Sequence, residues 1–149
     1  MTYDIHFQPV PRGEVSSTRV FTFGFRAALK VSGPQALVNR WAKTFMTPKG
    51  SNPLDKSEGT AFGRLFGSSN INAFARGIED VVLLSIEDAN DQVRKQDLEG
   101  LFPEDERLAN ATLFRLQTVE TQDGVEVWVR IVNVAGRVLP VRLVGLADR

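Results

Sequence analysis

The chain has 149 residues, a length typical of a single domain with a substantial buried core. Hydrophobic residues make up 42% of it and charged residues 24%, a composition that excludes extensive disorder. The absence of cysteine excludes a disulfide scaffold, a thiol nucleophile and a thiolate metal site. No apolar run approaches the roughly 18 residues of a membrane span, and the N-terminal residues show no secretory signal, so we expect no membrane partner.

The net charge is zero, but the charged residues are unevenly distributed. Residues 1–70 carry a net charge of +5, residues 71–107 a net charge of −6, and residues 112–149 a net charge of +1. A basic part and an acidic part can neutralise each other within one domain, which is the commoner arrangement. They can also match between neighbouring copies of the chain, because charge complementarity fixes partner and register. The sequence leaves both interpretations open.

The first predicted element is an N-terminal strand. In Arg19–Val31, small or β-branched residues alternate with Phe21, Phe23 and Phe25, which predicts an extended segment with one aromatic face. The only histidine, His6, lies further towards the N-terminus. Because no second histidine could complete a metal site with it, we assign it no role.

The next segment predicts a helix that begins at Pro34 and ends near Met46. Ser32 offers a capping hydroxyl, and proline is favoured in the first turn. Pro48 stops the helix, because the residue before a proline disfavours the helical conformation. One face of the helix carries apolar residues that we expect in the core: Leu37, Val38, Trp41 and Phe45.

The stretch from Thr44 to Asn70, TFMTPKGSNPLDKSEGTAFGRLFGSSN, is too apolar for a solvated linker. Its glycines and prolines predict a bent path, and we expect Phe62, Leu65 and Phe66 to fold it back onto the flanking helices. The polar part, Thr47–Thr60, is then displayed, which suits a docking loop.

The regular spacing of Gly59, Gly63 and Gly67 in this stretch raises the alternative of a phosphate-binding loop. A Walker loop requires Gly-Lys-Ser/Thr directly before a helix, and that sequence is missing. We therefore expect these glycines to permit close backbone packing.

A long amphipathic helix is predicted from about Asn72 to Leu98, ending at Gly100, because its apolar residues follow a 3.6-residue period. Its carboxylates could hold a hard cation, but a solvated acidic face is the commoner arrangement, and we predict no metal site. These carboxylates are Glu79, Asp80, Glu87, Asp88 and Asp91.

Three strands are predicted after this helix: Leu113–Thr121, Val125–Val134 and Arg137–Val144. Asp123-Gly124 is a two-residue hairpin signal, and the middle strand alternates Val125, Val127, Val129 and Ile131 with Glu126, Trp128, Arg130 and Val132. Pro140 cannot donate a ladder hydrogen bond, which predicts the third strand at a sheet edge. The fold class is therefore α+β: one domain, residues 1–149, with two main helices, a C-terminal antiparallel meander and an N-terminal strand.

No catalytic constellation is present. The sequence contains neither a G-x-S-x-G elbow nor an H-E-x-x-H motif. The arginines of the predicted strands alternate with glutamates, so they lack the basic excess of a nucleic-acid face. We predict no catalytic residue, no cofactor and no nucleic-acid partner.

The order of the segments is more informative than any single residue. A helix containing Trp41 precedes T-P-K-G-S-N-P and E-G-T-A-F-G-R-L-F, which are followed by a long helix, P-E-D-E-R-L and a valine-rich hairpin. From about Leu37 to Leu143 this order resembles the small baseplate-wedge proteins of contractile-tailed phages, the sheath-initiator family. The family also has members in contractile injection systems, and some members carry a lysozyme label.

The resemblance implies a non-enzymatic virion protein, assembled in the host cytoplasm and located in the tail baseplate. Six copies would surround the tail tube, contact the tube protein and the baseplate wedge proteins, and start polymerisation of the tail sheath protein. The two alternatives are a tail-completion or neck adaptor and a cytosolic enzyme or regulator unrelated to phage.

The resemblance also assigns residues. Gly50 and Pro53 match the start of the family's loop motif, and Gly59 and Thr60 match its end. Where many members carry an acidic residue and an arginine beside the first Gly/Pro pair, this chain has Ser51 and Asn52. The C-terminal strands would pair with the sheath protein by strand addition, through Val127, Val129, Arg137, Val138, Val141 and Arg142. Considered without the resemblance, the same edge could be blunted by Pro140 and its arginines and have no partner.

Overall fold

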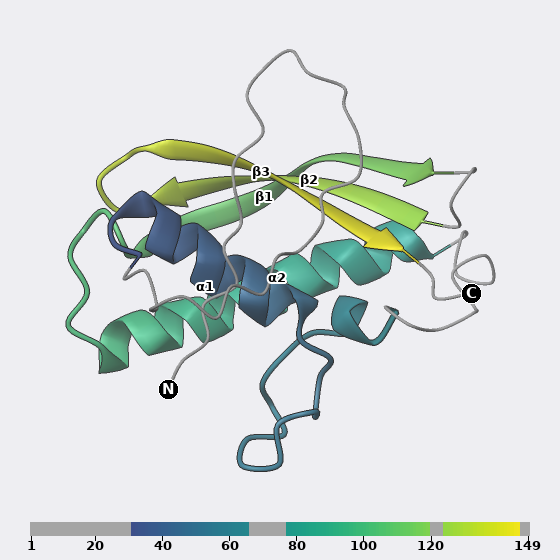
Figure 1. Ribbon diagram of the computed structural model, residues 1–149, viewed down its shortest axis with the longest axis horizontal. Coiled ribbons are helices and arrows are strands. Elements are labelled where there is room, and N and C mark those ends of the chain that lie inside the picture. The colour runs from purple at the N-terminus through teal and green to yellow at the C-terminus, as the bar shows by residue number, and fades with distance from the viewer. Residues whose placement is uncertain (1–30, 66–76, 120–123, 147–149) are drawn as a thin grey trace, which may run out of the picture.

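The computed structural model describes residues 31–65, 77–119 and 124–146. In chain order the elements are helix α1 (Pro34–Met46), the short 3-10 helix η1 (Phe62–Leu65), helix α2 (Ile78–Glu99) and strands β1 (Leu108–Val119), β2 (Gly124–Asn133) and β3 (Val138–Leu146). The strands form one antiparallel sheet in the order β1-β2-β3, and the helices lie on one face of it (Figure 1). This arrangement confirms the predicted α+β class and the C-terminal meander.

Several predictions fall outside these residues. These are the N-terminal strand Arg19–Val31, of which only Val31 is described, and His6, Phe66, Gly67 and the hairpin signal at Asp123.

Helix α1 begins at the predicted proline, but the predicted cap is wrong. Gly33, with a φ of 69°, occupies the cap position, and no side chain caps the helix. The Gly33 N–H instead donates a hydrogen bond to Oε1 of Glu106 at 2.6 Å. A glycine that can adopt a positive φ and reach a distant carboxylate therefore replaces the local hydroxyl cap of Ser32. The helix ends at Met46, as predicted.

Helix α2 begins at Ile78, with Gly77 at its cap position, and ends before Gly100, whose N–H is donated to the carbonyl of Gln96. The predicted end is confirmed. The predicted start near Asn72 lies outside the described residues.

Strand β1 starts at Leu108, five residues before the predicted start at Leu113. Its pairing with β2 has two irregularities, one between Leu108 and Asn110 and one between Leu113 and Arg115. Each such irregularity shifts the side-chain alternation by one position, so β1 lacks the continuous period of two from which strands are recognised.

The turn between β2 and β3 fixes which main-chain groups of β3 face outwards. Asn133 donates its N–H to the carbonyl of Arg137, and Gly136, with a φ of 82°, donates to the carbonyl of Asn133. Because hydrogen-bonded pairs alternate along an antiparallel ladder, Pro140, which lies opposite Arg130, falls at a position whose main-chain groups face away from β2. The missing N–H of Pro140 therefore removes no bond between β2 and β3, and within the described residues β3 is an edge strand, as predicted.

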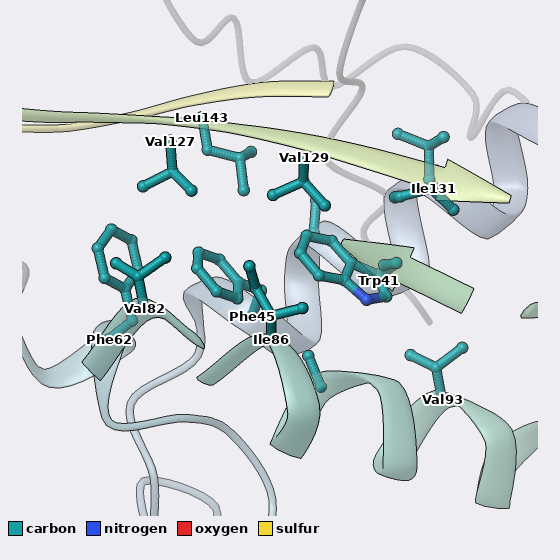
Figure 2. Packing of buried hydrophobic residues seen from close by; sticks show 14 of the residues in the cluster. Trp41, Phe45, Phe62, Val82, Ile86, Val93, Val127, Val129, Ile131 and Leu143 are labelled. Carbon is teal, nitrogen blue, oxygen red and sulfur yellow. The ribbon is translucent and has the colours of Figure 1, made fainter. Parts of the chain in front are cut away.

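The core lies between the inner face of the sheet and the two helices (Figure 2). The alternate residues of β2 that were predicted to share one face are all buried, and so is the predicted apolar face of α1. The ring of Phe45 stacks on Trp41 at 5.0 Å and contacts Phe62 at 4.7 Å, which confirms that the loop folds back through Phe62. The most deeply buried side chains include Leu37, Trp41, Phe45, Phe62, Val82, Val93, Val125, Val127, Val129 and Ile131.

One buried polar side chain links both helices to the sheet. Asn90 of α2 accepts the indole N–H of Trp41 at 2.9 Å and donates to the carbonyl of Ala111 in β1 at 3.0 Å. Both groups would be buried without a partner if Asn90 were removed, which makes this side chain costly to replace.

We therefore expect Asn90→Ala to lower the free energy of unfolding by about 1–3 kcal/mol, because the indole N–H is left unpaired in the core. In the double variant Trp41→Phe/Asn90→Ala, which removes both partners, the loss should be smaller than the sum of the single losses. Urea unfolding measures both. Gln117→Ala, at an exposed position on β1, is the control; additive losses at Trp41 and Asn90 would contradict the coupling.

Candidate protein-docking surfaces

The loop between α1 and η1 is closed at its base by backbone hydrogen bonds. The N–H of Thr60 donates a hydrogen bond to the carbonyl of Thr47 at 2.8 Å, and the N–H of Lys49 donates one to the carbonyl of Thr60 at 3.0 Å. Pro48 and Thr60 thus form an isolated parallel bridge. The two ends of the loop are held side by side, and the residues between them extend from the helix layer on the side away from the sheet (Figure 1).

Gly59 and Thr60 anchor this base from within. The hydroxyl of Thr60, which is fully buried, donates to the carbonyl of Phe45 at 2.6 Å. The Gln92 side chain of α2 accepts the N–H of Gly59 at 2.8 Å and donates to its carbonyl at 2.9 Å. Two of the four predicted loop-contact residues therefore hold the loop in place, while Gly50 and Pro53 are exposed.

The glycine spacing has a packing explanation, as predicted. A Cβ atom on Gly63 would lie 2.3 Å from the carbonyl oxygen of Thr47, and one on Gly59, whose φ is 92°, would lie 2.5 Å from the same atom. Side chains at either position would collide with the backbone that enters the loop. The η1 segment can approach Thr47 and Pro48 only because both positions are glycine.

The tip of the loop is held by turns formed by its own side chains. Asn52 accepts the N–H of Leu54 at 3.0 Å, and Asp55 accepts the N–H and the hydroxyl of Ser57 at 2.9 and 2.6 Å. The hydrogen bond from the Ser57 hydroxyl, followed by that from its N–H, lowers the pKa of Asp55. Gly50, with a φ of 80°, donates its N–H to the carbonyl of Glu58 across the loop.

These turns display one apolar side chain. Leu54 is 96% exposed, between Pro53 and Asp55. Leu54 is not among the predicted contact residues, although a single leucine within the turn-forming run Ser-Asn-Pro-Leu-Asp indicates a displayed apolar side chain. An apolar side chain held on a rigid polar loop loses little conformational freedom when a partner covers it.

The second surface is the free edge of β3. Within the described residues β3 pairs only with β2, and the alternation established by Asn133 and Arg137 directs the main-chain groups of Val138, Arg142 and Val144 outwards. The pairing of β2 with β3 has no register shift, whereas β1, at the opposite edge, has two. Irregular strands are poor templates for a further strand, so β3 is the edge better suited to pairing.

The predicted pairing residues divide between the two strands. Val127 and Val129 lie on the central strand β2, and their side chains are buried in the core. Val141 packs against the core from β3, and Arg137 lies in the turn before β3. Only Val138 and Arg142 combine an exposed side chain with outward-facing main-chain groups, so a partner strand can reach these two.

The acidic side of α2 is partly neutralised. Lys49 forms an ion pair with Asp88 at 2.9 Å, and Arg94 lies 3.6 Å from Asp91. Such exposed pairs contribute little to stability. Among the described residues no three potential metal ligands cluster, and no helix of that part of the chain is long and apolar enough to cross a membrane.

Comparison with known proteins adds no relative: no family model matches the chain, and no curated protein is detectably similar to it.

The tight base of the loop yields a prediction. Gly63→Ala should lower the free energy of unfolding by about 1–3 kcal/mol, because its Cβ must displace the backbone of Thr47 and Pro48. Gly77→Ala, where a Cβ atom meets nothing within 4 Å, is the matched control and should change the value by less than about 1 kcal/mol. Urea unfolding compares them, and equal effects would contradict the packing role of Gly63.

Proposed function

We propose that this protein is a structural component of a contractile-tail baseplate, where it nucleates the tail sheath around the tail tube. The observation that carries the proposal is the pairing of two unlike docking surfaces on one small domain. A regular strand edge lies in the sheet layer, and a rigid displayed loop extends from the opposite side of the helix layer (Figure 1). A subunit that joins one assembly to another requires two such surfaces.

The β3 edge would receive a strand of the sheath protein. Main-chain hydrogen bonds supply affinity in strand addition, and alternate side chains supply specificity. The exposed Val138, Arg142 and Val144 lie on the same face of β3, so an added strand would meet apolar and basic side chains in turn. A ring of copies would then present a ring of strand templates to the first layer of sheath subunits.

The loop would contact the baseplate wedge proteins. Its tip combines the exposed Leu54 with polar turns at Asn52 and Asp55, which is a compact contact of one apolar residue and a polar rim. Because Asn52 is hydrogen-bonded to Glu58, it shapes this contact where many family members carry a charged pair. We further propose six copies around the tail tube, without enzymatic activity and without a cofactor.

Substitution at the edge tests the sheath-nucleating role. Val144→Pro removes an outward-facing N–H while leaving the hydrogen bonds between β2 and β3 in place, as Pro140 already does four residues earlier. We expect the variant to fold and to join the baseplate, but to reduce sheath polymerisation on isolated baseplates at least tenfold. Sedimentation and negative-stain microscopy of reconstituted tails measure this.

Val144→Thr keeps the N–H and a β-branched side chain, so it should support normal sheath growth. Deleting the whole of β3 is a poorer experiment, because Leu143 is 3% exposed and belongs to the core. Normal sheath growth with folded Val144→Pro protein would refute strand addition at β3.

A map of the complete tail tests the location independently. We expect six copies of this chain where the baseplate meets the first sheath ring, with the Leu54 loop against wedge protein and β3 towards the sheath. Density for the chain at the neck, or no density in the virion, would overturn the proposal.

A further inference from the structure

The outer face of the sheet, which points away from the helices, is rich in arginine. Arg115 of β1 and Arg142 of β3 both lie opposite Trp128 of β2. Arg130 follows two residues later on β2, so its side chain lies on the same face. Arg115 has no ion-pair or hydrogen-bond partner among the described residues. The Arg130 guanidinium lies 5.0 Å from the ring centroid of Phe114, which is 64% exposed.

Charged and polar N–H donors on this face outnumber the carboxylates that could accept them. Among the described side chains Glu126 is the one carboxylate on the face, and it is already ion-paired to Arg142. The indole N–H of Trp128 has no acceptor within the described residues, and guanidinium and indole groups can only donate. A partner of this face must therefore supply carboxylates. The arginine face is defined by its exposed residues: Phe114, Arg115, Arg130 and Arg142.

A surface that supplies carboxylates lies on the N-terminal half of α2. Leu83 and Leu84 are 42% and 62% exposed there, and the exposed Glu79, Asp80 and Glu87 flank them without an ion pair among the described residues. The helix dipole explains the two carboxylates of the first turn. It explains neither the two exposed leucines nor Glu87 in the third turn. The acidic patch is defined by these residues: Glu79, Asp80, Leu83, Leu84 and Glu87.

The arginine face and the acidic patch match in spacing as well as in charge. Asp80 and Glu87 are seven residues apart, so they lie on the same side of α2, separated by about 10 Å along its axis. Arg115 and Arg130 are diagonal neighbours on adjacent strands, with Cα atoms about 8 Å apart. Long arginine side chains can bridge the difference. The leucines between the two carboxylates would then meet the exposed ring of Phe114.

We infer that the arginine face of one copy of this chain docks on the acidic patch of the next copy. The two surfaces belong to different layers of the domain, the sheet and the helices, so one copy can use both at once. A contact between unlike surfaces repeats from copy to copy and builds a ring when the rotation closes. The contact stands on the described surfaces alone, whereas its closure into a ring of six rests on the proposed function.

This contact gives the uneven distribution of charge two separate roles. The ion pair between Lys49 and Asp88 joins the basic and acidic parts of the sequence within one chain. The carboxylates of the acidic patch lie on the same helix but have no such partner, so they stay available to another copy. Because charge complementarity fixes the register of a contact, the patch would also set the angle between neighbouring copies.

Charge reversal in the isolated full-length protein tests the contact. Arg115→Glu/Arg130→Glu makes the arginine face acidic, and Asp80→Arg/Glu87→Arg makes the acidic patch basic. Like charges then oppose each other in either double variant, and we expect self-association at low salt to weaken at least about tenfold. The quadruple variant has opposite charges in the contact again and the net charge of the wild type, so its association should return to nearly the wild-type strength.

Sedimentation velocity over a range of protein concentrations measures each association. The wild type should form species larger than a dimer, and these should dissociate as the salt concentration rises. The matched control is Lys43→Glu/Lys56→Glu, which changes the net charge as much as the arginine variant does but at exposed positions outside both surfaces. It should associate like the wild type, and urea unfolding checks that every variant is folded.

A wild-type protein that stays monomeric at millimolar concentration and low salt would overturn the inference. A quadruple variant that associates no better than the two double variants would overturn it as well. Sheath growth is not measured in this experiment, so its failure is distinguishable from a failure of the proposed function, which Val144→Pro tests.

Discussion

The hydrogen bond from Trp41 to Asn90 fixes how the helix layer lies on the sheet. Trp41 belongs to α1, Asn90 to α2, and the other end of the Asn90 amide is held by Ala111 in β1. Apolar packing alone allows helices to slide along one another, since it has no preferred direction. A buried amide with two fixed partners removes that freedom, because a small displacement leaves polar groups unpaired in the core.

Both candidate docking surfaces depend on that fixed arrangement. The base of the loop is joined to α1 through the Phe45 carbonyl and to α2 through Gln92, so its position follows from the angle between the helices. The β3 edge is placed by the same core, because Leu143 and its neighbours pack against α1. The loop and the edge are therefore held in a fixed arrangement by one core, which suits the proposed role of joining two assemblies.

Much of the fold follows from local sequence patterns, and the exceptions have identifiable causes. The alternation of Val125, Val127 and Val129 predicts the central strand because β2 is regular and half buried. Irregular pairing conceals the start of β1, and a glycine cap joined to Glu106 replaces the cap predicted at Ser32. The contact between Gly33 and Glu106 joins residues 73 positions apart, so no local pattern contains it.

The two candidate docking surfaces were likewise predictable in part. Glycine spacing predicted close backbone packing in the loop, and the structure shows that the backbone approached is that of Thr47 and Pro48. The hydrogen bonds between Gln92 and Gly59 could not be predicted, since the two residues lie 33 positions apart in the sequence. The division of the strand residues into buried and edge positions likewise required the order of the strands, which alternation alone does not give.

The β3 edge combines features that favour one kind of partner over another. Consider two copies paired antiparallel through β3 with Arg142 on the dyad axis. The two Arg142 side chains would then face each other, and each Pro140 would lie opposite a Val144 of the other copy. The N–H of that Val144 could donate to the Pro140 carbonyl, but the Val144 carbonyl would receive no hydrogen bond, because Pro140 has no N–H. Like charges and missing donors both disfavour that pairing. An unrelated strand with an acidic or apolar residue opposite Arg142 avoids the repulsion between like charges. If it pairs only from Arg142 to Leu146, it also avoids the missing donor at Pro140. In this register the edge is blunted against its own copy, while it stays open to a complementary strand.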